Sequence, residues 1–441
     1  MKEIKKISCT LGSLLNDHVS LINNDISYTN RVLNFNLSLE QYDQLSKYVK
    51  TIGVTHRFTD VINRFKTPAN ETPPGFRVEC GLEANGVLKA DLVRDIAYDK
   101  NGKRRPTNVL FSADSANPYE ILPVSKIVAN LTCNPGIIYD LFINNPKANI
   151  GNQYKTRDEV MEEIGRIMGP GTDISVELND PFGKSETEII EEVEKFKEML
   201  SEYRLVIKVP HTGPVTKDNV SQLLTGNKKL ARSYQEVTTE GAFWGHNMAL
   251  MLKEKGYRVN FTLMFEPYQT ALAMQAKPYF INCFIRQRAM QSGIMDQCLK
   301  QYQATHNPKY IENIREMFLD KDYLTMDQAQ TDLLTIKKMA EEMLSYRHYH
   351  DVEGSDGLDS VRHTLRVFKN SNLDESKLII CSMEGEFNYP DIDKLLVEKE
   401  FEDLVHRVIV TAEPKYLARF TSCNHVVSYQ RRFMNAANGE K

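Results

Sequence analysis

A lysine stands inside the apolar run Leu205-Val206-Ile207-Lys208-Val209-Pro210, which has the composition of a buried strand. Burial of an ammonium group lowers the pKa of a lysine, and the neutral amine can attack a carbonyl carbon to form a Schiff base. The alternative is a strand-end lysine whose amine reaches solvent while its stem packs against apolar neighbours. The residue types that surround Lys208 in the fold therefore decide its interpretation.

Eight short runs rich in Val, Ile, Leu and Phe predict the strands that position this lysine. They are residues 108–114, 125–132, 173–178, 204–210, 258–265, 278–285, 377–383 and 407–413. Most of the intervals between them show helical periodicity. Alternating buried strands and amphipathic helices imply a parallel sheet, and eight strands suit a closed (β/α)8 TIM barrel over residues 108–425.

Four segments lie outside the strands and helices that a minimal barrel requires. Residues 1–107 are expected to form an N-terminal extension that is mainly helical, with an amphipathic helix around Leu39 to Phe65. Insertions are expected at residues 211–257, after the fourth strand, and at residues 286–376, after the sixth strand, where the pattern is mostly helical. Residues 426–441 are expected to form a C-terminal tail.

Composition narrows the class of protein. Hydrophobic residues make up 41% of the chain and charged residues 26%, as in ordinary globular proteins, and the net charge of -4 argues against a nucleic-acid partner. No apolar stretch is long enough for a membrane span or a signal peptide. Seven cysteines without a CxxC pair favour reduced thiols over disulfides or a zinc site. We expect a cytoplasmic protein that could form a homo-oligomer.

Polar side chains end six successive predicted strands, where the reactive groups of such barrels lie. They are Asp114, Asn134, Glu177, Lys208, Asn260 with Thr262, and Asn282. Each alone could cap a turn or pair with a surface charge. Together they suit carbonyl chemistry, because an amine nucleophile needs an acid or base nearby and an enamine intermediate needs hydrogen bonds to its hydroxyls.

Several segments resemble the signature blocks of the transaldolases, best over residues 108–288. They are Thr132-Cys133-Asn134-Pro135, Val206-Ile207-Lys208-Val209-Pro210, and Asn260-Phe261-Thr262-Leu263-Met264-Phe265 with Gln269-Thr270-Ala271. Asp114 and Glu177 fall at the places the resemblance expects. It implies a transferase of carbohydrate metabolism, as in the pentose phosphate pathway, that acts on a small sugar or sugar phosphate without a metal or an organic cofactor.

The resemblance also implies a role for each residue of the reacting centre. Lys208 is similar to the Schiff-base lysine. Asp114 is similar to the acid/base that takes the C4 hydroxyl proton as the C3–C4 bond of a ketose breaks. Glu177, acting with Thr262 through a held water, would move protons while the carbinolamine and imine form.

Further residues would bind the substrate. By the same resemblance, Asn134 and Asn260 would hold the dihydroxyacetone unit. Phe284 stands where the related fructose-phosphate aldolase subgroup has a tyrosine. Phenylalanine lacks the hydroxyl that could protonate and release the three-carbon unit, so it would favour transfer over simple cleavage.

The chain departs from the family at the residues that the resemblance expects to bind the substrate phosphate. Asn282-Cys283-Phe284 replaces a Ser-Pro-Phe block, and Gln287, between Arg286 and Arg288, replaces an arginine. Near the seventh strand, Glu386-Phe387-Asn388 replaces Ser-Phe-Arg. A carboxylate repels a phosphate. Either other arginines, such as Arg286, Arg288 or Arg347, restore an anion site, or the substrates are not the usual sugar phosphates.

Two further alternatives stay open. The chain could be a class I aldolase that releases the three-carbon unit, or a non-catalytic sugar-binding or assembly protein that kept the barrel. His211 and the Trp244-Gly245-His246 group, in the enlarged connection after the fourth strand, could either cover the site or be packing residues.

Overall fold

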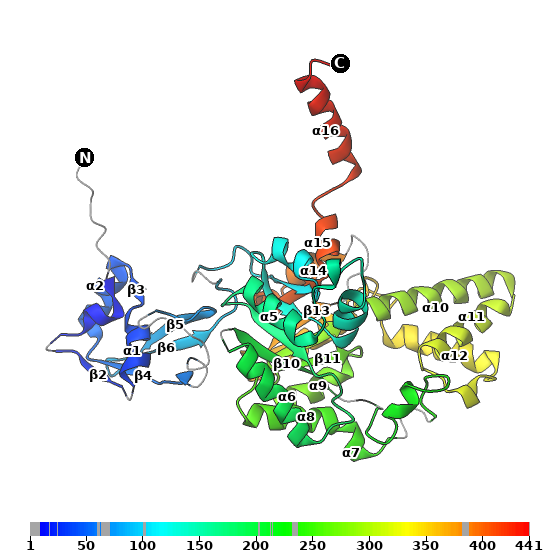
Figure 1. The fold of residues 1–441 in the computed structure, drawn as a ribbon, viewed down its shortest axis with the longest axis horizontal. Helices are drawn as coiled ribbons and strands as arrows, with labels where there is room; N and C mark the ends of the chain where they lie inside the picture. The colour runs from blue at the N-terminus through cyan, green and yellow to red at the C-terminus, as the bar shows by residue number, and fades with distance from the viewer. Residues whose placement is uncertain are drawn as a thin grey trace.

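The fold was analysed in a computed structural model. It describes residues 9–16, 18–23, 25–59, 62, 71–99, 103–201, 203–211, 213, 215–231, 237–381 and 388–440. Figure 1 shows an N-terminal domain in blue beside a central barrel, a helical excursion in yellow-green and a C-terminal helix that projects from the barrel.

The centre of the molecule is a closed barrel of eight parallel strands in the order β7 to β14. The strands are β7 (Leu110–Asp114), β8 (Val128–Thr132), β9 (Asp173–Glu177), β10 (Arg204–Pro210), β11 (Val259–Met264), β12 (Phe280–Phe284), β13 (Lys377–Cys381) and β14 (Val408–Ala412). Each strand lies within one of the eight predicted apolar runs. The (β/α)8 TIM barrel is therefore confirmed.

An apolar cluster fills the barrel interior toward its amino-terminal end. Val206, Phe280, Ile379 and Ile409 share one buried cluster there with Ile96, which follows the last strand of the N-terminal domain. Packing of branched and aromatic side chains closes this end of the barrel, as expected for such a core. Buried polar side chains such as Lys208, Thr262 and Asn282 lie above this cluster, toward the carboxyl ends of the strands.

Helices surround the barrel, and the sequence marks several of their ends. They are α4 (Pro118–Ile121), α5 (Arg157–Met168), α6 (Glu186–Met199), α8 (Trp244–Glu254), α9 (Tyr268–Ala273), α13 (Asp359–Lys369), α14 (Asn388–Leu396) and α15 (Pro414–Arg419), with the π-helix η3 (Gly136–Ile143). In α6, Ser185 and Glu188 form a capping box, while Ile189, Val193 and Phe196 are buried against the sheet.

The prediction of a mainly helical N-terminal extension was wrong. Its described residues form a mixed sheet in the order β2-β4-β6-β5, a two-stranded sheet β1-β3 and the helices α1 and α2. Its elements are β1 (Cys9–Thr10), β2 (Ser20–Ile22), α1 (Ile26–Leu33), β3 (Asn36–Leu37), α2 (Leu39–Tyr48), β4 (Thr51–Val54), β5 (Phe76–Leu82) and β6 (Val87–Arg94). The helix expected from Leu39 to Phe65 ends at Tyr48, because the alternately buried residues of β4 follow.

The N-terminal domain is joined to the barrel floor by a buried ion pair. Arg94, the last residue of β6, donates to the carboxylate of Asp173 at the start of β9. Arg204 Nε lies 3.0 Å from the same carboxylate, which is fully buried. Removal of one member of such a buried pair typically costs about 3–5 kcal/mol of stability. The two domains are thus linked at the end of the barrel opposite its polar mouth.

Both predicted insertions contain helices. Residues 211–257 hold α7 (Thr239–Ala242) and α8 among their described parts. Residues 286–376 hold α10 (Arg286–Thr305), α11 (Lys309–Asp320), α12 (Leu333–Tyr346) and α13. The first three of these pack around a core of their own that includes Met295, Ile314, Phe318 and Ile336.

The expected C-terminal tail is a helix, α16 (Asn424–Ala437). It begins two residues before the predicted boundary at residue 426. Among the described residues, no helix combines the length and the apolar character that crossing a membrane requires.

Candidate active site

Lys208 lies inside the barrel mouth and is paired with a carboxylate. Its Nζ is 3.0 Å from Oε2 of Glu177, and it donates to the carbonyl oxygen of Cys133 at 3.5 Å. Lys208 stands in register with Glu177 of β9 on one side and with Asn260 of β11 on the other. Only 4% of Lys208 is exposed, so the solvent-reaching alternative does not hold in this structure.

The charge around Lys208 differs from the sequence-based expectation. Burial alone lowers the pKa of this lysine, as expected, but the carboxylates of Glu177 and Asp114 outweigh burial and raise the pKa of Lys208 above its usual value. The expectation of a lowered pKa was wrong because it considered desolvation without the counter-charges. In this structure Lys208 is a buried ammonium, and its proton must leave before the amine can attack a carbonyl carbon.

Asp114 ends β7 beside Lys208. Its Oδ1 atom is buried and has no hydrogen-bond partner. Burial raises the pKa of Asp114 to about 6, with Lys208 and Arg286 acting to lower it and Glu413 and Glu177 acting to raise it. A carboxyl group with a pKa near 6 can both take and give a proton near neutral pH.

A row of buried polar side chains crosses the barrel beneath Lys208. Asn130 Nδ2 donates to Ser112 Oγ at 2.8 Å, Ser175 Oγ to Asn130 Oδ1 at 3.2 Å, and Asn260 Nδ2 to Ser175 Oγ at 3.1 Å. These bonds fix the amide of Asn260 with its oxygen unused. The sequence analysis missed three residues of this row, Ser112, Asn130 and Ser175. Each lies two residues before a predicted site residue or strand end. Because side chains alternate along a strand, each faces the barrel interior like the residue it precedes.

Unsatisfied polar atoms gather in the same part of the barrel. The buried atoms without a hydrogen-bond partner include Asp114 Oδ1, Thr132 Oγ1, Asn260 Oδ1, Asn282 Oδ1 and Thr411 Oγ1. Asp114, Thr132 and Thr411 lie at or next to the carboxyl ends of their strands, whereas Asn260 and Asn282 lie further inside the barrel, on β11 and β12. Buried polar groups are ordinarily hydrogen-bonded. These atoms are therefore suited to bind the hydroxyls of a small polar ligand.

Thr262 is buried on β11, next to a β-bulge. The register between β11 and β12 shifts between Phe261 and Met264, and Leu263 has a positive φ of 59°. Gln269 holds the backbone at this bulge, since its side chain accepts from the backbone N–H of Phe265 at 2.8 Å and donates to the carbonyl oxygen of Leu263 at 3.2 Å. A bulge at this place aims neighbouring side chains and is common beside functional sites.

The remaining predicted binding residues lie around the mouth with different surroundings. Asn134 Oδ1 accepts from the backbone N–H of Ile137 at 2.9 Å, so this oxygen caps the start of η3. Asn282 is buried on β12, and Phe284 at the end of that strand packs against Phe265 with ring centroids 4.7 Å apart. Gln287 lies in the first turn of α10 and is half-buried.

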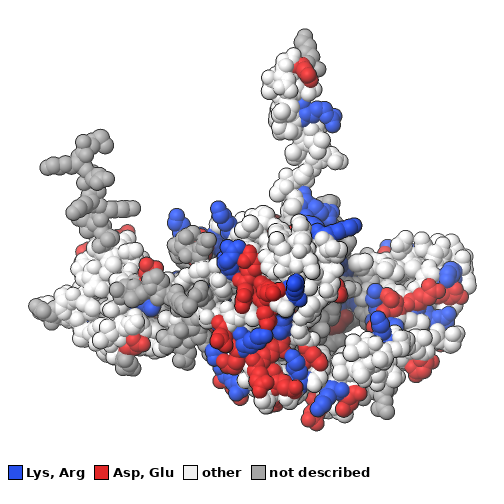
Figure 2. Space-filling model, in the orientation of Figure 1, with Lys and Arg blue, Asp and Glu red and all other residues white. Residues whose placement is uncertain are grey.

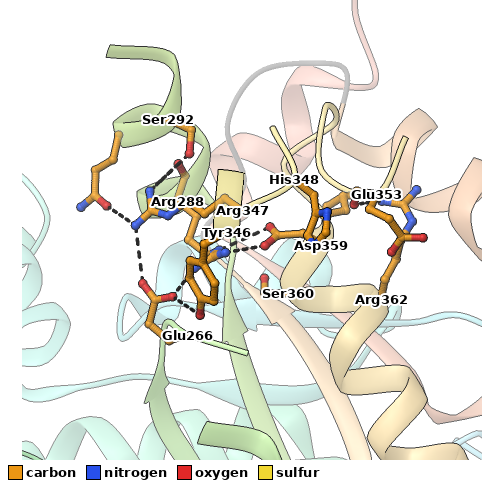
Figure 3. A network of polar contacts seen from close by, with 12 residues as sticks. Glu266, Arg288, Ser292, Tyr346, Arg347, His348, Glu353, Asp359, Ser360 and Arg362 are labelled. Carbon is orange, nitrogen blue, oxygen red and sulfur yellow. Dashed lines mark hydrogen bonds and ion pairs between the residues drawn. The ribbon is translucent and has the colours of Figure 1, made fainter. Parts of the chain in front are cut away.

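Arg288 and Arg347, two candidates for a replacement anion site, are already engaged. The guanidinium of Arg288 pairs with both Glu266 and Asp359. Arg347 donates to Ser292 Oγ at 3.2 Å, to Gln291 Oε1 at 3.1 Å and to Tyr323 Oη at 2.9 Å. Figure 3 shows Arg288 and Arg347 converging on Glu266, and both arginines are buried. This network ties the helical excursion to the barrel.

Arg286 is the candidate whose charge acts on the site. It is the first residue of α10, close after β12, and it lowers the pKa of Asp114.

Of the block predicted near the seventh strand, Glu386 and Phe387 lie outside the described residues. Asn388 is buried at the start of α14.

The histidines near Lys208 are packing residues in this structure. His211 Nε2 lies 3.2 Å from His246 Nδ1, and the His211 ring packs against Phe261 at 4.8 Å. Burial lowers the pKa of His211 to about 4. Trp244 Nε1 donates to the carbonyl oxygen of Pro181 at 2.7 Å. These contacts attach α8 to the barrel wall, which favours the packing alternative over a cover for the site.

Cys133 could compete with Lys208 as a nucleophile only as a thiolate. Burial raises the pKa of the Cys133 thiol to about 12. The thiol is therefore neutral at physiological pH, and the amine of Lys208 is the stronger candidate nucleophile.

A comparison with family models agrees with the geometry. The model described as Transaldolase/Fructose-6-phosphate aldolase matches residues 111–340, from β7 to α12. A search of curated proteins found no matching relative. The matched segment is more than half of the 441 residues and contains the strands that carry Asp114, Glu177, Lys208 and Asn260. The chain belongs to the transaldolase/fructose-6-phosphate aldolase family.

Proposed function

We propose that the protein is a transaldolase that moves a dihydroxyacetone unit from a ketose donor to an aldehyde acceptor through a Schiff base on Lys208. The observation that carries the proposal is the buried pair of Lys208 and Glu177, 3.0 Å apart, beside the unpartnered carboxyl oxygen of Asp114. A buried ion pair does not in general stabilise a fold more than apolar residues of similar size would, and a lysine paired with a carboxylate inside a polar barrel mouth is well suited to carbonyl chemistry.

The first half of the reaction forms an imine on Lys208 and then cleaves the C3–C4 bond of the ketose. Glu177 takes a proton from the Lys208 ammonium, and the free amine adds to C2 of the ketose. Loss of water from the carbinolamine gives a protonated imine, with Glu177 and Thr262 moving the protons. Asp114 then takes the C4 hydroxyl proton, the C3–C4 bond breaks toward the imine, and an aldehyde leaves an enamine on Lys208.

The second half runs the same steps in reverse with a new aldehyde. The enamine carbon attacks the acceptor carbonyl, and Asp114 returns its proton to the new C4 oxygen. Hydrolysis of the imine then releases a ketose and restores Lys208. Asn260 is proposed to hold hydroxyls of the three-carbon unit and Asn282 those of the adjoining carbons, because the side-chain oxygens of both residues lack partners. Asn134 is proposed to contact the three-carbon unit through its amide nitrogen, since its Oδ1 accepts from Ile137.

Phe284 is the feature that favours transfer over release. Its ring packs on Phe265 at the mouth and presents no hydroxyl that could protonate the enamine. An enamine shielded from proton donors persists until an acceptor aldehyde arrives.

Acceptor dependence tests the proposal. The purified protein is incubated with a panel of phosphorylated and unphosphorylated ketoses, each with and without an aldehyde acceptor such as erythrose 4-phosphate or glyceraldehyde. A new ketose that forms only with acceptor supports a transaldolase. Free dihydroxyacetone in the absence of acceptor would identify an aldolase instead, and no reaction with any donor would favour a binding protein.

A further inference from the structure

The bulge beside Thr262 has a strained backbone. Leu263 has a φ of 59°, in the left-handed region that residues with a Cβ rarely adopt. Such a conformation persists only where surrounding contacts fix it. Gln269 supplies part of this support, because its Oε1 accepts from the backbone N–H groups of Phe265 at 2.8 Å and of Glu266 at 2.9 Å. The backbone of the bulge is therefore tied to α9.

The side chain of Glu266 joins the same bulge to the helical excursion. Its Oε2 atom accepts from Tyr346 Oη at 3.1 Å and pairs with Arg288, and its Oε1 atom lies 3.5 Å from Arg347 Nη2. Arg288 lies in the first turn of α10, whereas Tyr346 is the last residue of α12 and Arg347 follows it. Figure 3 shows these three side chains gathered around Glu266. Both carboxylate oxygens are thus held by groups of the excursion.

This buried link differs from the charges on the outside of the excursion. In the view of Figure 2 the surface of the excursion mixes basic and acidic residues, and its exposed ion pairs include Lys309 with Glu316 on α11. Exposed pairs hold a structure weakly. Arg288 and Arg347 are buried, and a buried guanidinium needs a carboxylate close by. Arg288 also pairs with Asp359, so the carboxylate on the bulge does more than neutralise Arg288.

The bulge also carries Phe265, which contacts an aromatic residue of the barrel mouth. Phe265 directly precedes Glu266, and its ring packs against Phe284 at the end of β12, with ring centroids 4.7 Å apart. Phe284 in turn packs against the apolar cluster inside the barrel. Because neighbouring residues share one backbone, a displacement of Glu266 also displaces Phe265. The contact between the two rings therefore depends on where the excursion holds the Glu266 carboxylate.

We propose that Glu266 is a positioning residue whose contacts with the helical excursion keep Phe265 against Phe284, so that the two rings exclude water from the enamine. This inference rests on the proposed function, because the enamine exists only if Lys208 forms it. By excluding water, the excursion sets the proportion of three-carbon units that are transferred rather than released.

Release of the three-carbon unit needs no reagent besides water. The enamine carbon C3 takes a proton from a water molecule, and its double bond becomes the C–N double bond of a protonated imine. The hydroxide that remains adds to C2, its proton passes to nitrogen, and the C–N bond breaks. The products are dihydroxyacetone and the free amine of Lys208, so exclusion of water suppresses this route.

The division of the enamine between two products tests the proposal. Full-length proteins are given fructose 6-phosphate or fructose as donor and erythrose 4-phosphate as acceptor, and the seven-carbon ketose and free dihydroxyacetone are both measured. Tyr346→Phe removes one hydrogen bond from an exposed side chain, whereas Glu266→Ala removes all the contacts of the carboxylate. We expect the ratio of dihydroxyacetone to ketose to rise in both variants, by about tenfold or more in Glu266→Ala. Hydrogen exchange of the Phe265 amide should also become faster.

Two controls separate positioning from a loss of stability. Asp359→Asn removes the other carboxylate of Arg288, and Glu316→Ala breaks an exposed pair on α11; both should leave the product ratio unchanged. If Glu266→Ala does not fold, Tyr346→Phe decides alone. An unchanged ratio in the folded test variants, or an equal rise in Asp359→Asn, would overturn the inference and leave the proposed function intact. Absence of transfer by the unaltered protein would overturn both.

Discussion

Lys208 and Glu177 face each other across neighbouring strands of the barrel, with Nζ and Oε2 3.0 Å apart, and both residues lie at the same register position. The pair joins the two groups that imine formation needs, the nucleophile and an acceptor for its proton. Because Lys208 is buried and its pKa is raised, the amine becomes nucleophilic only when its proton is transferred, and Glu177 is the nearest carboxylate that can accept it.

Replacement of Asp114 by asparagine should separate imine formation from bond cleavage. Asparagine keeps the shape and loses the base, so turnover should fall by about 100- to 10,000-fold while trapping of the substrate on Lys208 persists. Stopped-flow assays and borohydride trapping measure the two steps. Normal turnover of Asp114→Asn would make Asp114 a structural residue.

The same substitution should stabilise the fold at neutral pH. The pKa of Asp114 is raised to about 6, so the folded state holds its proton more tightly than the unfolded state, and stability falls as pH rises from about 4 to 6. Asp114→Asn should remove that decline, with a gain of up to about 3 kcal/mol above pH 6, since one pKa unit is about 1.4 kcal/mol. Urea unfolding at pH 4 and pH 7 measures it; equal stability of variant and unaltered protein at pH 7 would contradict the raised pKa.

Replacement of Glu177 by glutamine should lower the pKa of Lys208. Burial favours the neutral amine, and the largest opposing charge would be gone. The pH dependence of Lys208 alkylation, followed by peptide mass spectrometry, should shift to lower pH, while imine formation slows because the proton acceptor is lost. Glu163→Gln, which removes an outer-surface partner of Arg166, serves as the control and should change neither. An unshifted Lys208 profile would contradict the proposed role of Glu177.

Two single substitutions should move the pH profile in opposite directions. Arg286 lowers the pKa of Asp114 and Glu413 raises it, so Arg286→Gln should shift the acid limb of kcat/KM to higher pH and Glu413→Gln to lower pH. Activity falls below the limb, because the base must be ionised to accept the C4 proton. Shifts of the same sign in both variants would mean that another group governs the limb.

Arg286 should also govern any preference for phosphorylated substrates. Charged hydrogen bonds are worth about 1.5–3 kcal/mol, so Arg286→Gln should raise the KM for fructose 6-phosphate tenfold or more and leave that for fructose unchanged. Arg288→Gln is the contrasting variant, because Arg288 is held by Glu266 and Asp359 and its loss should reduce the melting temperature first. An equal loss on both sugars in Arg286→Gln would remove the anion-binding role.

The barrel was predictable because its signal is local. Strands buried on both faces produce apolar runs such as those around Ile207 and Ile379, and their number and spacing specify a closed parallel sheet. The site residues followed from polar side chains at the ends of those runs. The N-terminal sheet also had a local signal, the Asn85-Gly86 turn between the alternating runs of β5 and β6. The helical periodicity that begins at Leu39 does form α2, but this helix is short and ends at Tyr48.

Other features depend on contacts that sequence spacing does not reveal. The raised pKa of Lys208 reflects two carboxylates delivered by other strands, Glu177 and Asp114. Arg288 was a plausible phosphate ligand by position, yet Glu266 and Asp359, from segments before and after it, bind it instead. Charges brought together by long-range folding determined both outcomes.

The most direct test of the account is borohydride reduction in the presence of a ketose donor, followed by peptide mass spectrometry. We expect a reduced three-carbon adduct on the peptide that contains Lys208, dependent on substrate and absent from Lys208→Ala. A substrate-dependent adduct on any other lysine would contradict the account.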